Sequence, residues 1–118
     1  MRQPLWLFDL DNTLHDASSA IFPSINQAMT SYVARHLNLD HQAASQLRDH
    51  YWRLYGATLL GLVKHHSIDP HHFLHETHLF NEVSGKHLQD LAGMVRGEKG
   101  LRQILNRLPG EKILLTNA

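Results

Sequence analysis

The chain has 118 residues, the length of one domain, and its 11 basic and 11 acidic residues balance to a formal charge of zero. This balance excludes a strong field that would attract nucleic acid or an anionic membrane surface, so we expect neither as a partner. The absence of cysteine excludes disulfides, thiolate metal sites and a cysteine nucleophile. The N-terminal apolar run is too short for a signal peptide or a membrane span, so we expect a soluble, cytoplasmic protein.

The first predicted element is a strand formed by the apolar run Leu5–Phe8. A run without polar alternation is typical of a strand that is buried on both faces of a parallel sheet. Asp9 and Asp11 follow it, and because side chains alternate along an extended chain, they point to one side while Leu10 points to the other. Ligands of open parallel sheets bind beyond the carboxyl ends of the strands, where two carboxylates repel each other unless a cation or a proton intervenes. The pair therefore indicates a functional site, although Asp, Asn and Thr at this point are also ordinary turn residues.

The middle of the chain is predicted to be helical. Four or five helices are expected, at residues 23–38, 41–55, 57–66 and 70–78, with a short fifth at 86–95 and a loop at 81–85. Pro23 is expected in the first turn of its helix, and Asp40 and Asp69 are expected to cap the helices that follow them. Gly56 is expected to end or bend the second helix.

A helix over 101–108, stopped by Pro109-Gly110, and a strand over 112–118 complete the predicted elements. This second strand is again an apolar run, and it ends in Thr116 and Asn117. The order of strand, helices, helix and strand predicts an α/β fold.

Eleven histidines are the unusual feature of the composition, and they are densest over residues 65–78. A helix that begins near Pro70 would bring His71, His75 and His78 to one face, which would allow a metal cluster. The alternative is a set of solvated or helix-capping imidazoles with weak pH sensitivity below neutrality. We favour this alternative because the chain has no cysteine and no His-Glu-x-x-His motif.

Two segments resemble signatures of the haloacid dehalogenase (HAD) superfamily, most of whose members are phosphatases. Asp9-Leu10-Asp11-Asn12-Thr13 is similar to the family's Asp-x-Asp-x-Thr motif, and Leu114–Ala118 is similar to its second motif, a Ser or Thr followed by Asn at the end of the next strand. The resemblance implies a HAD-like Rossmannoid parallel sheet, of which only the first two core strands are present, with an inserted all-helical cap. It divides the chain into a partial core at 1–16 and 96–118 and a helical cap at 17–95.

The same resemblance implies a Mg2+-dependent phosphomonoester hydrolase with Asp9 as the nucleophile and Asp11 as the general acid/base. It implies that Mg2+ is held by the Asp9 carboxylate and the backbone carbonyl of Asp11, together with an Asp that comes later in the family's chains. The hydroxyl of Thr116 would bind a phosphoryl oxygen, helped by backbone N–H groups around Leu10 and Asn117. A phosphate ester requires such groups: an attacking oxygen, a proton for the leaving alkoxide and a cation to offset the developing charge.

A narrower resemblance concerns Tyr51–Leu62 and Leu14-His15-Asp16, which are similar to HAD proteins of the pyrimidine 5'-nucleotidase type. It implies that the substrate is a small phosphorylated metabolite, a nucleoside 5'-monophosphate. It also suggests His15 and Tyr55 as substrate contacts, because aromatic faces stack on bases. The alternative is that the tyrosines in this segment only form the core of a pair of helices.

The chain departs from the family pattern in its second half. It lacks the Lys that steadies the aspartyl-phosphate, the later acidic Mg2+ ligands and the remaining core strands, so we expect a truncated form that is inactive alone. Its exposed sheet edge would allow self-association. Three other hypotheses stay open: a dehalogenase of the same fold, against which the second acid Asp11 argues, a non-catalytic binding or regulatory fragment, and an all-helical interaction module.

Overall fold

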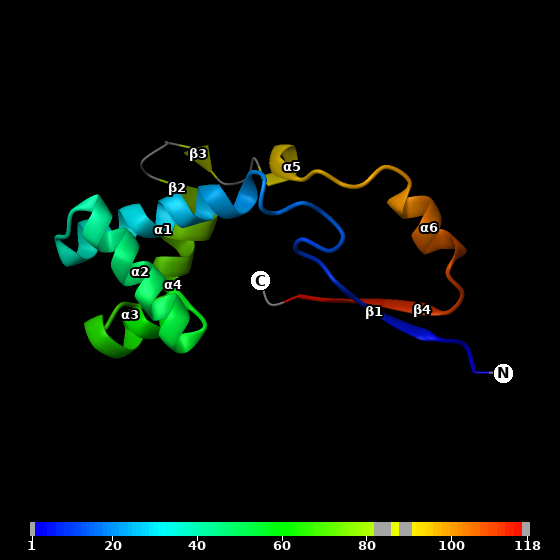
Figure 1. Cartoon of the computed structure of the whole chain (residues 1–118), viewed down its shortest axis with the longest axis horizontal. Coiled ribbons are helices and arrows are strands. Elements are labelled where there is room, and N and C mark those ends of the chain that lie inside the picture. Colours follow the sequence, from blue (N-terminus) through cyan, green and yellow to red (C-terminus); the bar gives the residue numbers. More distant parts are fainter. Residues whose placement is uncertain (1, 82–85, 88–90, 117–118) are drawn as a thin grey trace. The chain divides into compact units, whose positions relative to one another are not determined.

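The computed structural model describes residues 2–81, 86–87 and 91–116. The chain has an α/β fold with a two-stranded parallel sheet and several helices, which confirms the predicted fold class (Figure 1). It divides into two compact units, a sheet unit formed by residues 1–22 and 91–118 and a helical unit formed by residues 23–90. Each unit is described by itself below.

The sheet unit is built on two parallel strands, β1 (Leu5–Asp9) and β4 (Glu111–Leu115), drawn in blue and red in Figure 1. The register pairs the first residues of the two strands with each other and Asp9 with Leu115, so both carboxyl ends lie at the same edge. Trp6 Nε1 donates to the carbonyl of Pro109 at 2.8 Å, beside the turn into β4. Gly110 forms this turn with a φ of 92°. Both strands therefore lie where the apolar runs predicted them.

The exposure of this sheet corrects the prediction that Leu5–Phe8 is buried on both faces. Leu7 and Leu115 are each 63% exposed, and every residue of β4 is exposed. A continuous apolar run identifies a strand, but its burial depends on what packs against it. In the described part of the sheet unit, only two short helices accompany the strands: α5 (Leu91–Met94) and α6 (Leu101–Arg107), the latter without a buried residue.

In its described residues, the helical unit contains four helices and one π-helical turn. They are α1 (Ile21–Leu37, whose first two residues belong to the sheet unit), α2 (His41–Tyr55), α3 (Thr58–His66), α4 (Pro70–Leu74) and η1 (His75–Leu79). The predicted caps are confirmed: Asp40 accepts from the N–H of Ala43 at 2.7 Å, and Asp69 accepts from the N–H of His72 at 2.8 Å. Among the described residues, no helix combines the length and the apolar character that crossing a membrane requires.

The helix predicted over 86–95 is wrong at its start, where a strand stands in a segment that was expected to contain only helices and loops. Phe80–Asn81 (β2) and Lys86–His87 (β3) pair as a short antiparallel ladder, and α5 covers only the end of the predicted helix. Residues 82–85, most of the predicted loop, lie outside the described residues. Apolar spacing over so short a stretch does not distinguish a helix from a hairpin followed by one helical turn.

The core of the helical unit consists of side chains from its four helices: Tyr32, Val33, Ala44, Tyr51, Leu62 and Phe73. Gly61 allows α3 to approach α2 closely, because a Cβ at this position would overlap the ring of Tyr51. Tyr51 is therefore a core residue, as one of the two sequence-based interpretations of this segment expected. Tyr55 is half-buried beside this core.

Candidate functional site

The carboxyl-terminal edge of the β1–β4 sheet brings the predicted catalytic residues to one place. Asp9 ends β1 and is in register with Leu115, so Thr116 follows immediately beyond its partner. Asp11 lies two residues beyond β1, at the start of the loop that leaves this edge. Asn117 lies outside the described residues. The edge thus presents an acid at the end of β1, a second acid in the loop that follows, and a hydroxyl residue directly after β4.

The loop after β1 is closed by hydrogen bonds that centre on Asn12. Its φ is 58°, in the left-handed region that Asn tolerates better than most residues. Its Oδ1 accepts from the N–H groups of Ala17 and Ser18 at 2.9 and 3.1 Å, and its Nδ2 donates to the Ser18 hydroxyl at 2.8 Å. The Leu14 N–H donates to the carbonyl of Leu10 at 2.9 Å. The Asn12 side chain therefore folds the loop back on itself beside the two acids.

The Asp9 carboxylate is held by Thr13, whose hydroxyl donates to Asp9 Oδ2 at 2.6 Å. This contact crosses the turn, because the two residues are four positions apart. It orients the carboxylate of this exposed acid. The other carboxylate oxygen, Oδ1, takes no part in this hydrogen bond. In the sequence, Thr13 is recognisable only as part of the Asp-x-Asp-x-Thr motif and of the turn, and its contact with Asp9 depends on how this turn folds.

The Asp11 carboxylate is held by His15. The distance from His15 Nε2 to Asp11 Oδ1 is 2.9 Å, and the two side chains are 9% and 28% exposed. His15 Nδ1 is buried and has no hydrogen-bond partner among the described residues. His15, the expected substrate contact, thus lies at the site with Nε2 engaged by Asp11. Substrate contact by His15 stays a prediction.

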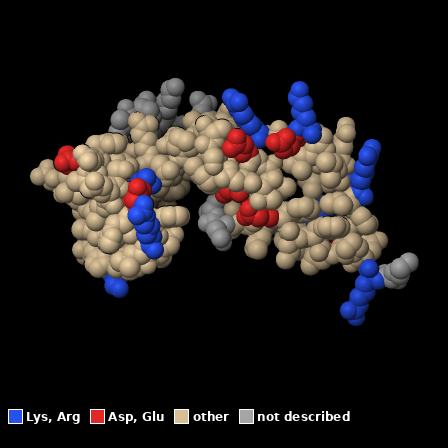
Figure 2. Space-filling model, viewed as in Figure 1, with Lys and Arg blue, Asp and Glu red and all other residues tan. Residues whose placement is uncertain are grey.

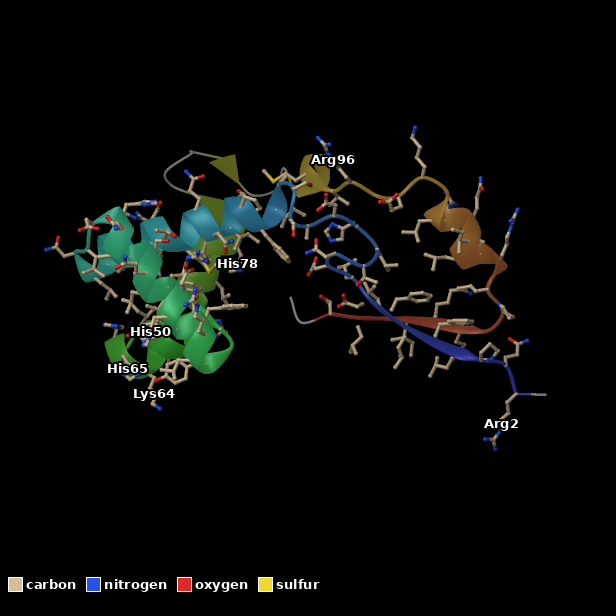
Figure 3. All side chains as sticks on the ribbon, viewed as in Figure 1. Arg2, His50, Lys64, His65, His78 and Arg96 are labelled. Carbon is tan, nitrogen blue, oxygen red and sulfur yellow. The ribbon has the colours of Figure 1, made fainter. Side chains whose placement is uncertain are left out.

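A small cavity of about 180 Å3 opens beside this loop, lined by Asn12, Thr13, His15, Asp16 and Glu98. The N–H of Asp16 donates to the carbonyl of Arg96 at 3.4 Å. Figure 3 labels Arg96. This bond and a short antiparallel bridge between His15 and Gly97 hold the loop to the segment before α6. Nothing in the sequence analysis pointed to Glu98, because this segment has no recognisable motif.

Tyr55, the other expected substrate contact, belongs to the helical unit. Its hydroxyl lies 2.6 Å from His65 Nε2, and Lys64 Nζ lies 5.3 Å from the centre of its ring (Figure 3). The ring of Tyr51 lies beside it, with the centroids 6.0 Å apart. These contacts explain how Tyr55 is oriented within its own unit. Its role in binding substrate stays a prediction.

Besides His65, two further histidines of the helical unit pair with tyrosine hydroxyls. His72 Nδ1 lies 2.8 Å from the Tyr32 hydroxyl, and His66 Nε2 lies 2.7 Å from the Tyr51 hydroxyl. Burial raises the pKa of both tyrosines above the usual value of 10.0, because it disfavours the phenolate. Burial also lowers the pKa of His78 from its ordinary value of 6.5.

The carboxyl edge of the sheet suits a hard cation through its donor atoms. The carboxylates of Asp9 and Asp11 and the carbonyl groups of their turn are oxygen ligands, which Mg2+ prefers. Among residues 2–81, 86–87 and 91–116, no group of three or more His, Asp or Glu side chains is arranged to hold a metal. Two protein donors fit an ion that keeps several of its water ligands.

The described Lys and Arg side chains are scattered over the face shown in Figure 2 and form no continuous basic patch there. Acidic groups lie close to several of them, and Arg48 pairs with Asp49 at 2.9 Å. Such interspersed charges create no extended field of one sign on this face.

Comparison with known proteins shows a similarity over part of the chain. No protein-family model matches the chain. Over 65 residues, however, the chain is 31% identical to "Phosphate metabolism protein 8" of Saccharomyces cerevisiae. The chain is similar to a phosphate metabolism protein. The match covers 55% of this chain but 20% of the yeast protein, so the chain spans about a fifth of the length of this relative.

Proposed function

We propose that the chain carries the catalytic edge of a Mg2+-dependent phosphomonoester hydrolase that works through an aspartyl-phosphate. The observation that carries this proposal is the parallel register of β1 and β4, which brings Asp9, Asp11 and Thr116 to one edge. Two further findings support it: the motifs that resemble the HAD superfamily, and the similarity to a yeast protein named for phosphate metabolism.

In the proposed mechanism, Asp9 attacks the phosphorus atom through its carboxylate while the bond to the ester oxygen breaks. Asp11 gives its proton to this leaving oxygen, and then, as a carboxylate, takes a proton from the water that attacks the aspartyl-phosphate. The bond from phosphorus to Asp9 breaks, so inorganic phosphate leaves and both acids return to their starting states. Thr116 donates its hydroxyl to a phosphoryl oxygen. Bound Mg2+ would be held by Asp9 and Asp11 and would offset the negative charge of the transferring group.

The proposed substrates are nucleoside 5'-monophosphates. The resemblance of Tyr51–Leu62 to pyrimidine 5'-nucleotidases supports this choice, with Tyr55 as the residue proposed to stack on the base. Such a substrate is a small metabolite, and we propose that it is hydrolysed in the cytoplasm.

Beryllium fluoride tests the proposal, because with Mg2+ it forms an analogue of the aspartyl-phosphate on a nucleophilic Asp. We expect the protein to give a bound fluorine NMR signal that requires Mg2+ and disappears in Asp9→Asn. The matched control is Asp16→Asn, which removes a nearby acid of the same loop, keeps an acceptor for the Ser19 N–H at 3.1 Å, and should keep the signal. A signal that persists in Asp9→Asn would remove Asp9 as the nucleophile.

Measuring the release of phosphate from UMP by the natural gene product distinguishes a hydrolase from a protein that only binds the phosphate analogue. We expect Asp11→Asn to lower kcat by about 10²–10⁴-fold, the usual contribution of general acid–base catalysis, while it still binds beryllium fluoride. A protein that binds beryllium fluoride but releases no phosphate from any nucleotide would instead support the hypothesis of a non-catalytic binding fragment.

A further inference from the structure

His15 is the most buried polar side chain around the candidate site. Its ring is 9% exposed, and its Nε2 lies 2.9 Å from Asp11 Oδ1. The pair forms across a turn, outside any helix, and the loop on which it depends is closed by the Asn12 side chain. The bridge between His15 and Gly97 fixes the backbone on the other side. The imidazole is therefore held in place by local structure on both sides.

The geometry points to His15 as a positioning residue for the proton donor Asp11, an inference that rests on the proposed function. His15 Nε2–H donates to Asp11 Oδ1, so the carboxyl group is fixed with its other oxygen, Oδ2, available to the leaving oxygen of the ester. A proton donor has to lie within hydrogen-bond reach of the atom that it protonates, and a carboxyl group that rotates freely reaches it only part of the time. This role differs from the substrate contact expected of His15.

The second ring nitrogen supports this assignment. His15 Nδ1 is buried without a hydrogen-bond partner among the described residues. Burial of an unpaired polar atom is unfavourable, so an apolar side chain of similar size would fill this position at lower cost. The contact from Nε2 to Asp11 is therefore the polar contact that favours a histidine at this position. The contact also defines the tautomer, because a neutral imidazole that donates from Nε2 carries no proton on Nδ1.

The inference makes a prediction about the leaving group. UMP releases an alkoxide, which needs a proton as the phosphorus–oxygen bond breaks. p-Nitrophenyl phosphate releases a stabilised phenolate, which leaves without one. The ratio kcat/KM reports the step in which the leaving group departs, whereas hydrolysis of the aspartyl-phosphate, in which Asp11 also acts, is the same for both substrates. Loss of the correct Asp11 orientation should therefore lower kcat/KM for UMP much more than for p-nitrophenyl phosphate. A purely structural role for His15 would lower both values alike.

The test compares His15→Leu with His15→Gln in the natural gene product, with kcat and KM measured for both substrates. Leu fills the space without a donor, whereas Gln carries an N–H group near the position of Nε2. We expect His15→Leu to lower kcat/KM for UMP by about 10²-fold, the scale expected for misplacement of a catalytic group, with little effect on kcat/KM for p-nitrophenyl phosphate. His15→Gln should restore much of the activity on UMP. The beryllium fluoride signal should persist in both variants.

Three outcomes decide between the possibilities. Equal losses of kcat/KM on the two substrates would overturn the positioning role and leave the proposed hydrolase intact. Absence of phosphate release from both substrates by the unsubstituted protein would overturn the proposed function itself. Nitrogen-15 NMR of the unsubstituted protein needs no variant to fold: a His15 ring protonated at Nε2 and bare at Nδ1 is expected, and a ring protonated only at Nδ1 would overturn the inference.

Discussion

Thr13 is the side chain whose contact bears most directly on the proposed nucleophile. Its hydroxyl lies 2.6 Å from Asp9 Oδ2 and sets the orientation of the carboxylate. We expect Thr13→Val, which keeps the shape and removes the donor, to weaken beryllium fluoride binding about tenfold, the lower end of what a hydrogen bond to a charged group contributes. Thr13→Ser keeps the donor and should bind nearly as well as the unsubstituted protein. Fluorine NMR titration measures both, and equal binding by all three proteins would contradict the orienting role.

His78 carries a pH dependence within the helical unit. Its pKa in the folded protein is lowered by burial, so below its ordinary pKa of 6.5 the unfolded chain takes up a proton that the folded chain does not. The free energy of unfolding should therefore fall as the pH drops from 6.5 toward the folded-state pKa, and level off below it. Urea unfolding at neutral pH and at about pH 5 measures this fall.

The control for this pH dependence is His78→Asn. Its side-chain N–H can take the place of Nδ1–H, which lies 2.7 Å from a Thr77 hydroxyl that already donates to the carbonyl of Phe73, and it does not titrate. The variant should lose less stability between the two pH values than the unsubstituted protein. Other histidines contribute equally to both proteins, so the difference isolates His78. An identical fall in the two proteins would show that His78 does not cause it.

At the scale of elements, the β1–β4 pair depends on the turn at Gly110. Its φ of 92° favours glycine, and a Cβ there would collide with the carbonyl oxygen of Pro4, directly before β1. Gly110→Ala should therefore weaken the pairing and with it the candidate site. Gly100→Ala is the matched control, because Gly100 also has a positive φ, 83°, but open space around its Cβ position. We expect faster amide exchange in β1 and β4 for Gly110→Ala alone, and equal exchange in the two variants would contradict the close approach.

The elements that the sequence predicted are those that local patterns determine. The apolar runs predicted both strands. Asp40 and Asp69 predicted where α2 and α4 begin, because capping requires one side chain and its neighbouring N–H groups. The exposure of the sheet and the β2–β3 ladder depend on packing partners that one segment does not encode. The contacts of Thr13 and His15 depend on the turn that Asn12 makes. The motif therefore predicted the two acids but not the side chains that orient their carboxylates.

At the scale of the molecule, the two units differ in how their apolar residues are used. The helical unit buries its own core around Tyr32 and Phe73. In the sheet unit, Ala17 is the buried apolar residue of the described part, whereas Leu5, Leu7 and Leu115 are more than half exposed. A two-stranded sheet with open faces is marginal in water, so the sheet unit gains stability from any surface that covers these side chains.

We expect self-association through β1, because among the described residues this strand pairs only with β4 and its run Leu5–Phe8 carries no charge. Edge strands without charge are templates for further pairing, and a Lys on the strand opposes it. Leu7→Lys should therefore shift the chain toward monomer in sedimentation equilibrium. Leu60→Lys adds the same charge at a similarly exposed leucine of the helical unit, where 56% of the residue is accessible, and should leave the association unchanged. Equal association of the two variants would exclude β1 as the interface, since the added charge alone would then account for any effect.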